Sequence, residues 1–327
     1  MQDKTCCEGI YSTRRNRLYG DLFTSCETHQ LVMHPCICFH HGLTPWTARC
    51  WQRLFAWRVT KESLHGHPPR DHHWKENQVC RLTKSLYGLK QASKQWYNKL
   101  TTFLYSINFT HSKTDSSLFI RKIENAFITL LIYVDDIVIV GNNMKEIQVV
   151  KNSLNGAFAI KDLGHLKFFL GLEIARTKKG IHIFQRKYAL EILSDVGMTD
   201  AKLVSTPMVK KNEKHFKQVV VHDISAYRRI IGHLLYLVNT KPDISFSVQC
   251  LSQFVQAPTK LHHQAAQRVL RYIKFSPSQG IFYPKDTNVQ IKEFSDSDWA
   301  SCISTRYSTT VFSIFLGESL ISWKTKK

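Results

Sequence analysis

Two adjacent carboxylates interrupt an otherwise apolar run in the middle of the chain. The run reads Ala-Phe-Ile-Thr-Leu-Leu-Ile-Tyr over residues 126–133, then Val134-Asp135-Asp136, then Ile-Val-Ile-Val-Gly over residues 137–141. Both arms are rich in β-branched and aromatic residues, which favours two buried strands joined by a tight hairpin. Carboxylates at the end of a sheet offer oxygen ligands to a hard cation such as Mg²⁺. A solvated turn is the alternative, because Asp is a common turn residue.

The charge of the chain points to a polyanionic partner. The 327 residues, enough for two domains, carry a formal net charge of +20. Lys and Arg neutralise phosphates and release counterions, although a solvated surface also carries such charge. Asp135 and Asp136 divide the only candidate for an apolar run of 18 residues, so we expect no membrane span. The N-terminus lacks the charged-then-apolar pattern of a signal peptide.

Further motifs stand on both sides of the hairpin. They are Leu-Tyr-Gly88-Leu-Lys90-Gln91, Ile-Lys-Asp-Leu-Gly164, Phe-Phe-Leu-Gly171-Leu172-Glu173, Gly-His-Leu-Leu-Tyr236, Lys-Pro-Asp243-Ile and Ser-Asp296-Ser-Asp-Trp299. In this order and spacing, from about Glu76 to the last residue, they resemble the Pol polyprotein of copia-type LTR retrotransposons. Within that family, Tyr-Val-Asp-Asp resembles the active-site hairpin of reverse transcriptases.

The resemblance implies an RNA-directed DNA polymerase, a nucleotidyltransferase with Mg²⁺ or Mn²⁺ as cofactor. Its partners would be an RNA template, a DNA primer and deoxynucleoside triphosphates, in the cytoplasm or nucleus. The site residues implied are Asp135 and Asp136 as catalytic metal ligands, Gly88, Lys90 and Gln91 for substrate binding, Gly171, Leu172 and Glu173 for the primer grip, and Asp296 for ribonuclease H.

Two of these segments have simpler structural interpretations. Leu89, Ala92, Trp96 and Leu100 fall at near-helical spacing, which predicts one apolar face of an amphipathic helix. Gly88 would also let backbone approach a substrate closely, and Lys90 offers a point charge to phosphate. The segment around Gly171 is either a sharp turn or a buried strand with a glycine bulge.

The resemblance and the hydrophobic pattern together predict an α+β fold. Residues 76–210 would form the reverse transcriptase, with partial fingers and an antiparallel palm-like sheet. Residues 211–289 would form a helical connection of three helices, in which His262 and His263 begin the third helix rather than bind metal. Residues 290–327 would form a three-stranded, truncated ribonuclease H-like sheet with open edges and without a working nuclease site.

Residues 1–75 lack a sustained period of 3.6 or 2, and we expect them to be poorly ordered. Seven of the nine cysteines lie in the first 80 residues, but Cys36, Cys38 and the following histidines lack the spacing of a zinc site. A shifted reading frame explains this segment better. Codons for residues 47–57, read one base later, can spell Gln-Leu-Asp-Val-Gly-Asn-Ala-Phe-Leu-His-Gly, and residues 62–69 can give Val-Tyr-Met-Asp-Ile-Pro-Pro in the same way.

Such a shift has a direct chemical consequence. Both strings resemble the family's motifs upstream of Gly88, and the first contains the family's first catalytic aspartate. A two-metal site clamps the attacking and leaving oxygens with shared carboxylates, so loss of that aspartate predicts near-total loss of polymerisation. Two hypotheses remain: an enzyme that polymerises weakly with Asp135 and Asp136, and a non-catalytic remnant that binds nucleic acid.

Overall fold

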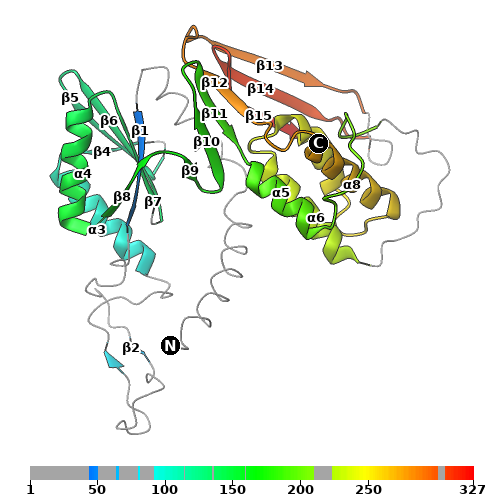
Figure 1. The fold of residues 1–327 in the computed structure, drawn as a ribbon, viewed down its shortest axis with the longest axis horizontal. Helices are drawn as coiled ribbons and strands as arrows, with labels where there is room; N and C mark the ends of the chain where they lie inside the picture. Colours follow the sequence, from blue (N-terminus) through cyan, green and yellow to red (C-terminus); the bar gives the residue numbers. More distant parts are fainter. Residues whose placement is uncertain are drawn as a thin grey trace. The chain divides into compact units, whose positions relative to one another are not determined.

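Helices and antiparallel strands make up the chain, which confirms the predicted α+β class (Figure 1). The computed structural model describes residues 92–327, except 114, 135, 159, 210–222 and 301–305, and the backbone of three earlier strands. These strands are β1 (Thr44–Cys50), β2 (Leu64–His65) and β3 (Cys80–Arg81). Two compact units result, one covering His41–Leu166 and the other including Lys167–Lys327.

The first unit contains a six-stranded antiparallel sheet. Its strands in chain order are β1, β4 (Thr110–His111), β5 (Leu118–Ile123), β6 (Ala126–Tyr133), β7 (Asp136–Gly141) and β8 (Ile160–His165). The spatial order is β4-β5-β6-β7-β1-β8. The strand β1 therefore lies inside the sheet, between β7 and β8, although it belongs to the segment for which the sequence predicts little order. The rest of residues 1–75, apart from β2, lies outside the described residues.

Two helices cover one face of this sheet, α3 (Ala92–Ser106) and α4 (Met144–Phe158). Trp96, Leu100 and Leu104 of α3 are buried, which confirms the predicted apolar helix face. They share a core with Ile137 and Ile139 of β7. Because side chains alternate along a strand, Asp136 belongs to the face opposite the helices.

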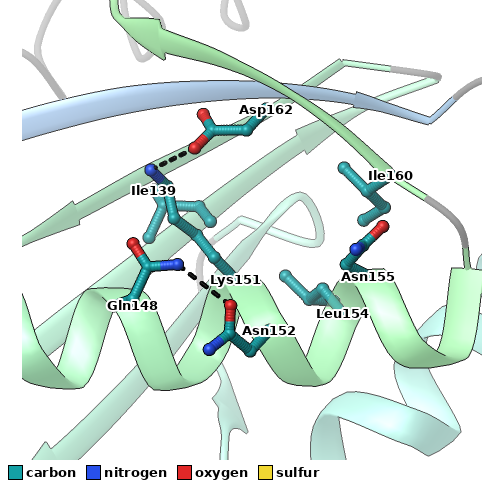
Figure 2. Close-up of a pocket in the computed structure, with 8 residues that line it drawn as sticks. All are labelled: Ile139, Gln148, Lys151, Asn152, Leu154, Asn155, Ile160 and Asp162. Atoms are coloured by element: carbon teal, nitrogen blue, oxygen red, sulfur yellow. Dashed lines mark hydrogen bonds and ion pairs between the residues drawn. The ribbon is translucent and has the colours of Figure 1, made fainter.

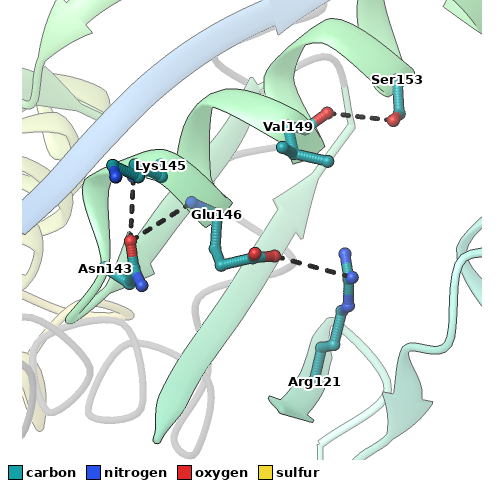
Figure 3. Close-up of polar contacts among 6 residues, drawn as sticks. All are labelled: Arg121, Asn143, Lys145, Glu146, Val149 and Ser153. Atoms are coloured by element: carbon teal, nitrogen blue, oxygen red, sulfur yellow. Dashed lines mark hydrogen bonds and ion pairs between the residues drawn. The ribbon is translucent and has the colours of Figure 1, made fainter.

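The start of α4 is fixed by polar contacts (Figure 3). The side-chain oxygen of Asn143 accepts hydrogen bonds from the backbone N–H groups of Lys145 and Glu146, at 3.0 and 3.4 Å. This arrangement satisfies donors that a helix leaves without intrahelical partners. Glu146 also lies 3.7 Å from Arg121 of β5, which ties the first turn of α4 to the sheet.

The second unit begins with a four-stranded antiparallel sheet in the order β12-β11-β10-β9. The strands are β9 (Phe168–Phe169), β10 (Leu172–Arg176), β11 (Gly180–Phe184) and β12 (Ile281–Pro284). Between β11 and β12 the chain forms α5 (Arg186–Asp195), α6 (Ile224–Leu237), the short 3-10 helix η1 (Pro242–Ile244), α7 (Ser245–Ser252) and α8 (Lys260–Phe275).

The three helices predicted between residues 211 and 289 are confirmed as α6, α7 and α8. Their apolar stripes form one core with α5, except that Leu235 is 46% exposed. His262 lies at the predicted start of α8, where its Nδ1 accepts a hydrogen bond from the Thr259 backbone in a capping box.

The last three strands form a separate antiparallel sheet in the order β13-β14-β15. They are β13 (Ile291–Ser297), β14 (Thr310–Leu316) and β15 (Ser319–Lys326), as the sequence predicts. The strand β15 buries Ile321 and Trp323 and packs against α7, where the hydroxyls of Ser245 and Thr325 lie 3.2 Å apart. The strand β13 is exposed along its whole length.

Candidate active site

The strands on either side of the carboxylate pair form the hairpin β6–β7. Tyr133 and Asp136 are directly opposed in the ladder, and Val134 follows β6 as a turn residue. Val134 has a φ of +48° and is 62% exposed. A β-branched residue rarely adopts this left-handed conformation, so neighbouring structure must hold the turn in place. Asp135, the main predicted catalytic residue, lies outside the described residues.

Trp96 of α3 supplies one contact that holds this turn. Its indole Nε1 donates a hydrogen bond to the carbonyl oxygen of Val134 at 3.1 Å. The indole is only 3% exposed and meets the ring of Phe158 edge-on, with 5.2 Å between the ring centroids. The sequence predicts Trp96 as a core residue of a helix. It gives no sign that the same side chain bonds to the hairpin turn 38 residues away.

The strand β1 pairs with β7 next to Asp136. In the β1–β7 ladder, Arg49 is the residue opposite Asp136, and in the β1–β8 ladder it is opposite Lys161. Directly opposed residues of antiparallel strands share a face of the sheet, with Cβ atoms about 4.5–5.5 Å apart. The backbone register therefore brings positions 133, 136, 49 and 161 into one row across the sheet.

The described residues do not by themselves form a metal site at this hairpin. Within the described part of the chain, no three His, Cys, Asp or Glu side chains come together as metal ligands. The register neighbours of Asp136 are a tyrosine and an arginine rather than carboxylates. We therefore assign no chemical step to a metal at this hairpin.

The other face of β8 carries a structural ion pair (Figure 2). The ammonium of Lys151, on α4, lies 2.6 Å from a carboxylate oxygen of Asp162, in a pocket of about 190 Å³. The side chain of Lys151 is 8% exposed and that of Asp162 is 49% exposed. Partial burial raises the pKa of Asp162, but hydrogen bonds from Lys151 and from the Gly164 backbone outweigh this effect and lower it overall. The Ile-Lys-Asp-Leu-Gly164 motif thus anchors α4 to β8.

The segment predicted as the primer grip forms a second tight hairpin, β9–β10. Leu170 and Gly171 occupy its turn with φ values of +49° and +77°. The hydroxyl of Tyr236, on α6, donates a hydrogen bond to the Leu170 carbonyl at 2.6 Å. A Cβ atom added at Gly171 would lie 2.6 Å from the same hydroxyl. The sharp turn is confirmed, and Gly171 is required both by its conformation and by close approach of Tyr236.

The remaining residues predicted for the primer grip also have local structural roles. Leu172 is buried, and a carboxylate oxygen of Glu173 accepts a hydrogen bond from the Lys187 backbone N–H at 2.6 Å. Lys187 lies in the first turn of α5, where a carboxylate satisfies an open N–H and complements the helix dipole. Phe168, at the other side of the hairpin, is 64% exposed. Contact of this hairpin with a primer remains a prediction.

The comparisons with known proteins decide the family. Residues 58–210 match the family described as reverse transcriptase (RNA-dependent DNA polymerase). A transposon Ty5-1 protein of Saccharomyces cerevisiae is 30% identical over 253 residues, which are 76% of this chain and 82% of that protein. The Pol polyprotein of transposon RE1 of Arabidopsis thaliana is 40% identical over 252 residues, and that of TNT 1-94 of Nicotiana tabacum is 35% identical over 263 residues.

The chain belongs to the copia-type retrotransposon Pol family. The matched segments cover 77% of this chain in both plant comparisons, but only 17% of the RE1 polyprotein and 20% of the TNT 1-94 polyprotein. The family assignment made from the ordered motifs is thus confirmed. It supports RNA-directed DNA polymerisation as the activity of the family, and nucleic acid and nucleotides as its substrates.

The structure describes only some of the other residues implied by the copia-type resemblance. Gly88, Lys90 and Gln91 lie outside the described residues, so their role in substrate binding stays a prediction. Asp296 lies on the exposed strand β13, opposite Val311 of β14. This position agrees with a strand that presents a carboxylate, but a ribonuclease H site remains a prediction. In the part of the chain that the structure describes, we find no helix of the length and apolarity that a bilayer crossing demands.

Proposed function

We propose that this chain is a reverse transcriptase domain of a copia-type element that binds nucleic acid and has lost DNA polymerisation. The observation that carries the proposal is that the sequence upstream of Gly88 contains no motif that supplies the family's first catalytic aspartate. Polymerases of the two-metal type clamp the attacking and leaving oxygens with metal ions held by carboxylates. Without the first aspartate, such a site loses a carboxylate that holds its metal ions.

Nucleic-acid binding follows from charge rather than from the hairpin. The formal net charge is +20, and basic side chains gain affinity for phosphates through counterion release. This binding needs no divalent metal, so it survives the loss of catalysis. The proposed ligands are an RNA template and a DNA primer, with the exposed hairpin around Phe168 as one contact.

A weak polymerase that uses Asp135 and Asp136 alone is the competing function. Primer extension on an RNA template, with deoxynucleoside triphosphates and Mg²⁺ or Mn²⁺, separates the two. We expect the unmodified chain and the Asp135→Asn variant to give the same background incorporation. Incorporation by the unmodified chain that Asp135→Asn abolishes would establish the weak polymerase and refute the proposal.

The binding half of the proposal has its own measurement. Fluorescence anisotropy with a labelled RNA–DNA primer-template should give an affinity that is unchanged by EDTA and falls steeply with salt. Affinity that disappears in EDTA would place a metal ion in the binding site, against the proposal. A salt-independent affinity would argue against phosphate contacts as its source.

The domain boundaries belong to the same proposal. Residues 76–210 would correspond to partial fingers and palm, 211–289 to the helical connection and 290–327 to a ribonuclease H-like sheet. The exposed strand β13 and the position of Asp296 support a ribonuclease H relationship. Family relationship suggests action in the cytoplasm or nucleus.

A further inference from the structure

The strand β13 forms one edge of the last sheet (Figure 1). All of its residues pair with β14, and it pairs with no other strand that the structure describes. The ladder contains no register shift, and residues 291–297 include no proline. Natural proteins commonly protect an edge strand with a bulge, a proline or a covering segment. In the described part of the chain β13 has none of these, so its outer side is open to another strand.

Hydrogen bonds beyond both ends of β13 show which of its backbone groups face outward. The Gln290 carbonyl accepts a hydrogen bond from the Gly317 N–H at 2.7 Å, and the Asp298 N–H donates to the Thr309 carbonyl at 3.1 Å. Gln290 and Asp298 therefore direct these groups toward β14. Because this direction alternates along an antiparallel strand, the even-numbered residues between them do the same. The N–H and C=O groups of the odd-numbered residues of β13 point to the open edge.

The even-numbered side chains of β13 share one face of the sheet. They are Lys292, Phe294 and Asp296. Across this face Phe294 is opposite Ser313, which is opposite Trp323, and Trp323 is buried on the strand that packs against α7. Phe294 itself is 60% exposed and meets the ring of Phe315 edge-on, with 5.8 Å between the ring centroids. The apolar face thus continues past its covered part to the open edge.

One register of two β13 strands satisfies both charge and hydrogen bonding. When two copies pair antiparallel about Phe294, that residue lies opposite its own copy, and Lys292 lies opposite Asp296 of the second copy. The two-fold symmetry repeats this contact, which gives two pairs of opposite charge. The same register sets the outward-facing odd-numbered residues against each other, as antiparallel hydrogen bonding requires. It also pairs every residue of β13.

The neighbouring registers lose this charge complementarity. The register centred on Glu293 places that carboxylate opposite its own copy, and the register centred on Ser295 places Phe294 opposite Asp296. Like charges directly opposed destabilise strand pairing, and phenylalanine offers a carboxylate no ionic partner. Among the residues that the structure describes, neither Lys292 nor Asp296 forms an ion pair. A second copy in the register about Phe294 supplies a partner for each.

We infer that β13 is a self-association edge, at which two copies of this chain pair antiparallel about Phe294 and join their last sheets into one. The occupant is a second copy because the same strand supplies both halves of each charge pair. Pairing at this edge needs no nucleic acid, nucleotide or metal, so the inference is independent of the proposed function. A single strand pair lies at the small end of specific interfaces, so we expect a dimer that dissociates at about micromolar concentrations.

Sedimentation velocity of the full chain over a wide range of protein concentration tests the inference. At about 0.15 M salt, repulsion between two chains of net charge +20 is screened beyond about 8 Å. We expect a reversible equilibrium between monomer and dimer. Lys292→Asp and Asp296→Lys each turn both pairs of opposite charge into pairs of like charge. Each variant should therefore weaken dimerisation by on the order of tenfold.

A mixture of these two variants tests the register itself. In a mixed dimer one chain carries only basic side chains at positions 292 and 296, and the other carries only acidic ones, so both pairs are again of opposite charge. We expect the mixture to dimerise at concentrations where each variant alone is monomeric. The double variant Lys292→Asp/Asp296→Lys should dimerise like the unmodified chain. Failure of either combination to restore dimerisation would overturn the register.

Two more variants separate this edge from other surfaces. Lys324→Asp makes the same change of net charge as Lys292→Asp, at an exposed position of β15, and should leave dimerisation unchanged. Ser295→Pro removes an N–H that faces the open edge rather than β14, so it should weaken the dimer while near-ultraviolet circular dichroism shows a folded protein.

Three results would overturn the inference. The first is an unmodified chain that sediments as a monomer at every concentration. The second is a dimer that Lys292→Asp and Asp296→Lys leave unchanged, because it would form through another surface. The third is an equal loss of dimerisation in Lys324→Asp, which would show a general effect of net charge. Primer extension and nucleic-acid binding test the proposed function separately, so the two failures are distinguishable.

Discussion

The indole N–H of Trp96 donates to the carbonyl oxygen of Val134 at 3.1 Å, and so connects helix α3 to the turn that carries the carboxylate pair. The acceptor residue has a left-handed backbone, and its side chain is 62% exposed. The bond therefore fixes a strained turn through its backbone and leaves the Val134 side chain in solvent. Trp96 is a positioning residue for the hairpin in this account.

The Trp96→Phe substitution tests that role. It keeps an aromatic ring in the core and removes the N–H, so we expect a loss of about 1 kcal/mol of unfolding free energy. Trp96→Ala also removes the packing against Phe158 and should cost about 3–5 kcal/mol. Urea denaturation measures both. Equal stability of Trp96→Phe and the unmodified chain would show that the hydrogen bond contributes nothing.

The ion pair between Lys151 and Asp162 predicts an asymmetric pair of mutants. Asp162→Asn leaves the nearly buried Lys151 without its carboxylate partner, and we expect a cost of about 1–2 kcal/mol, reduced because Asp162 is half exposed. Lys151→Met leaves Asp162 in contact with water and should cost less. The reverse order in urea denaturation would contradict this assignment of burial.

The same ion pair predicts that the protein loses stability at acidic pH. The folded-state pKa of Asp162 lies below its ordinary value of 3.8. The pair therefore stabilises the protein above about pH 4 and loses its contribution as the pH falls through the folded-state pKa. The Asp162→Asn variant should lack this part of the acid dependence.

Gly171 and Tyr236 should show energetic coupling. Gly171→Ala places a Cβ where the Tyr236 hydroxyl lies and forces alanine into a left-handed conformation, which alone costs about 1–2 kcal/mol. Tyr236→Phe removes both the clash and the hydrogen bond to Leu170. We expect the double variant to be more stable than the sum of the two single losses predicts, by about 1 kcal/mol or more. Additive losses would mean that the hydroxyl does not restrict position 171.

The buried Lys241 predicts that the free energy of unfolding depends on pH in the alkaline range. The side chain is 1% exposed and donates to the Ser276 carbonyl at 2.7 Å, and burial lowers the pKa of Lys241 to about 8. An unfolded lysine has a pKa of about 10.4. Unfolding therefore takes up a proton between about pH 8 and about pH 10.4. Stability should therefore rise by about 1–2 kcal/mol from pH 8 to 9.5, relative to a Lys241→Met variant. Parallel curves for the two proteins would contradict the lowered pKa.

Local patterns in the sequence were sufficient for several elements. The apolar arms around Asp136 predict β6 and β7 because β-branched runs favour buried strands, and the spacing of Trp96 and Leu100 predicts α3. The stripe from Ile224 to Leu237 predicts α6 in the same way. Each of these signals depends only on neighbours within one or two turns.

Hydrophobic periodicity does not predict which residues far apart in the sequence contact each other. Nothing in the local sequence predicts that β1 lies between β7 and β8, since that pairing joins segments about ninety residues apart. The bonds from Trp96 to Val134 and from Tyr236 to Leu170 span 38 and 66 residues. Periodicity reports that a residue is buried, but it does not identify which side chain or backbone group it contacts.

Sequencing the DNA and transcript across codons 47–57 tests most directly whether Arg49 stands at the position of a carboxylate. The account predicts that the frame one base later reads through Gln-Leu-Asp and Phe-Leu-His-Gly, with an insertion or deletion before the codon for Glu76. If that frame does not encode the aspartate, the sequence upstream of Glu76 does not hold the family's first catalytic carboxylate in a shifted frame. The explanation of lost polymerisation by a shifted frame would then be wrong.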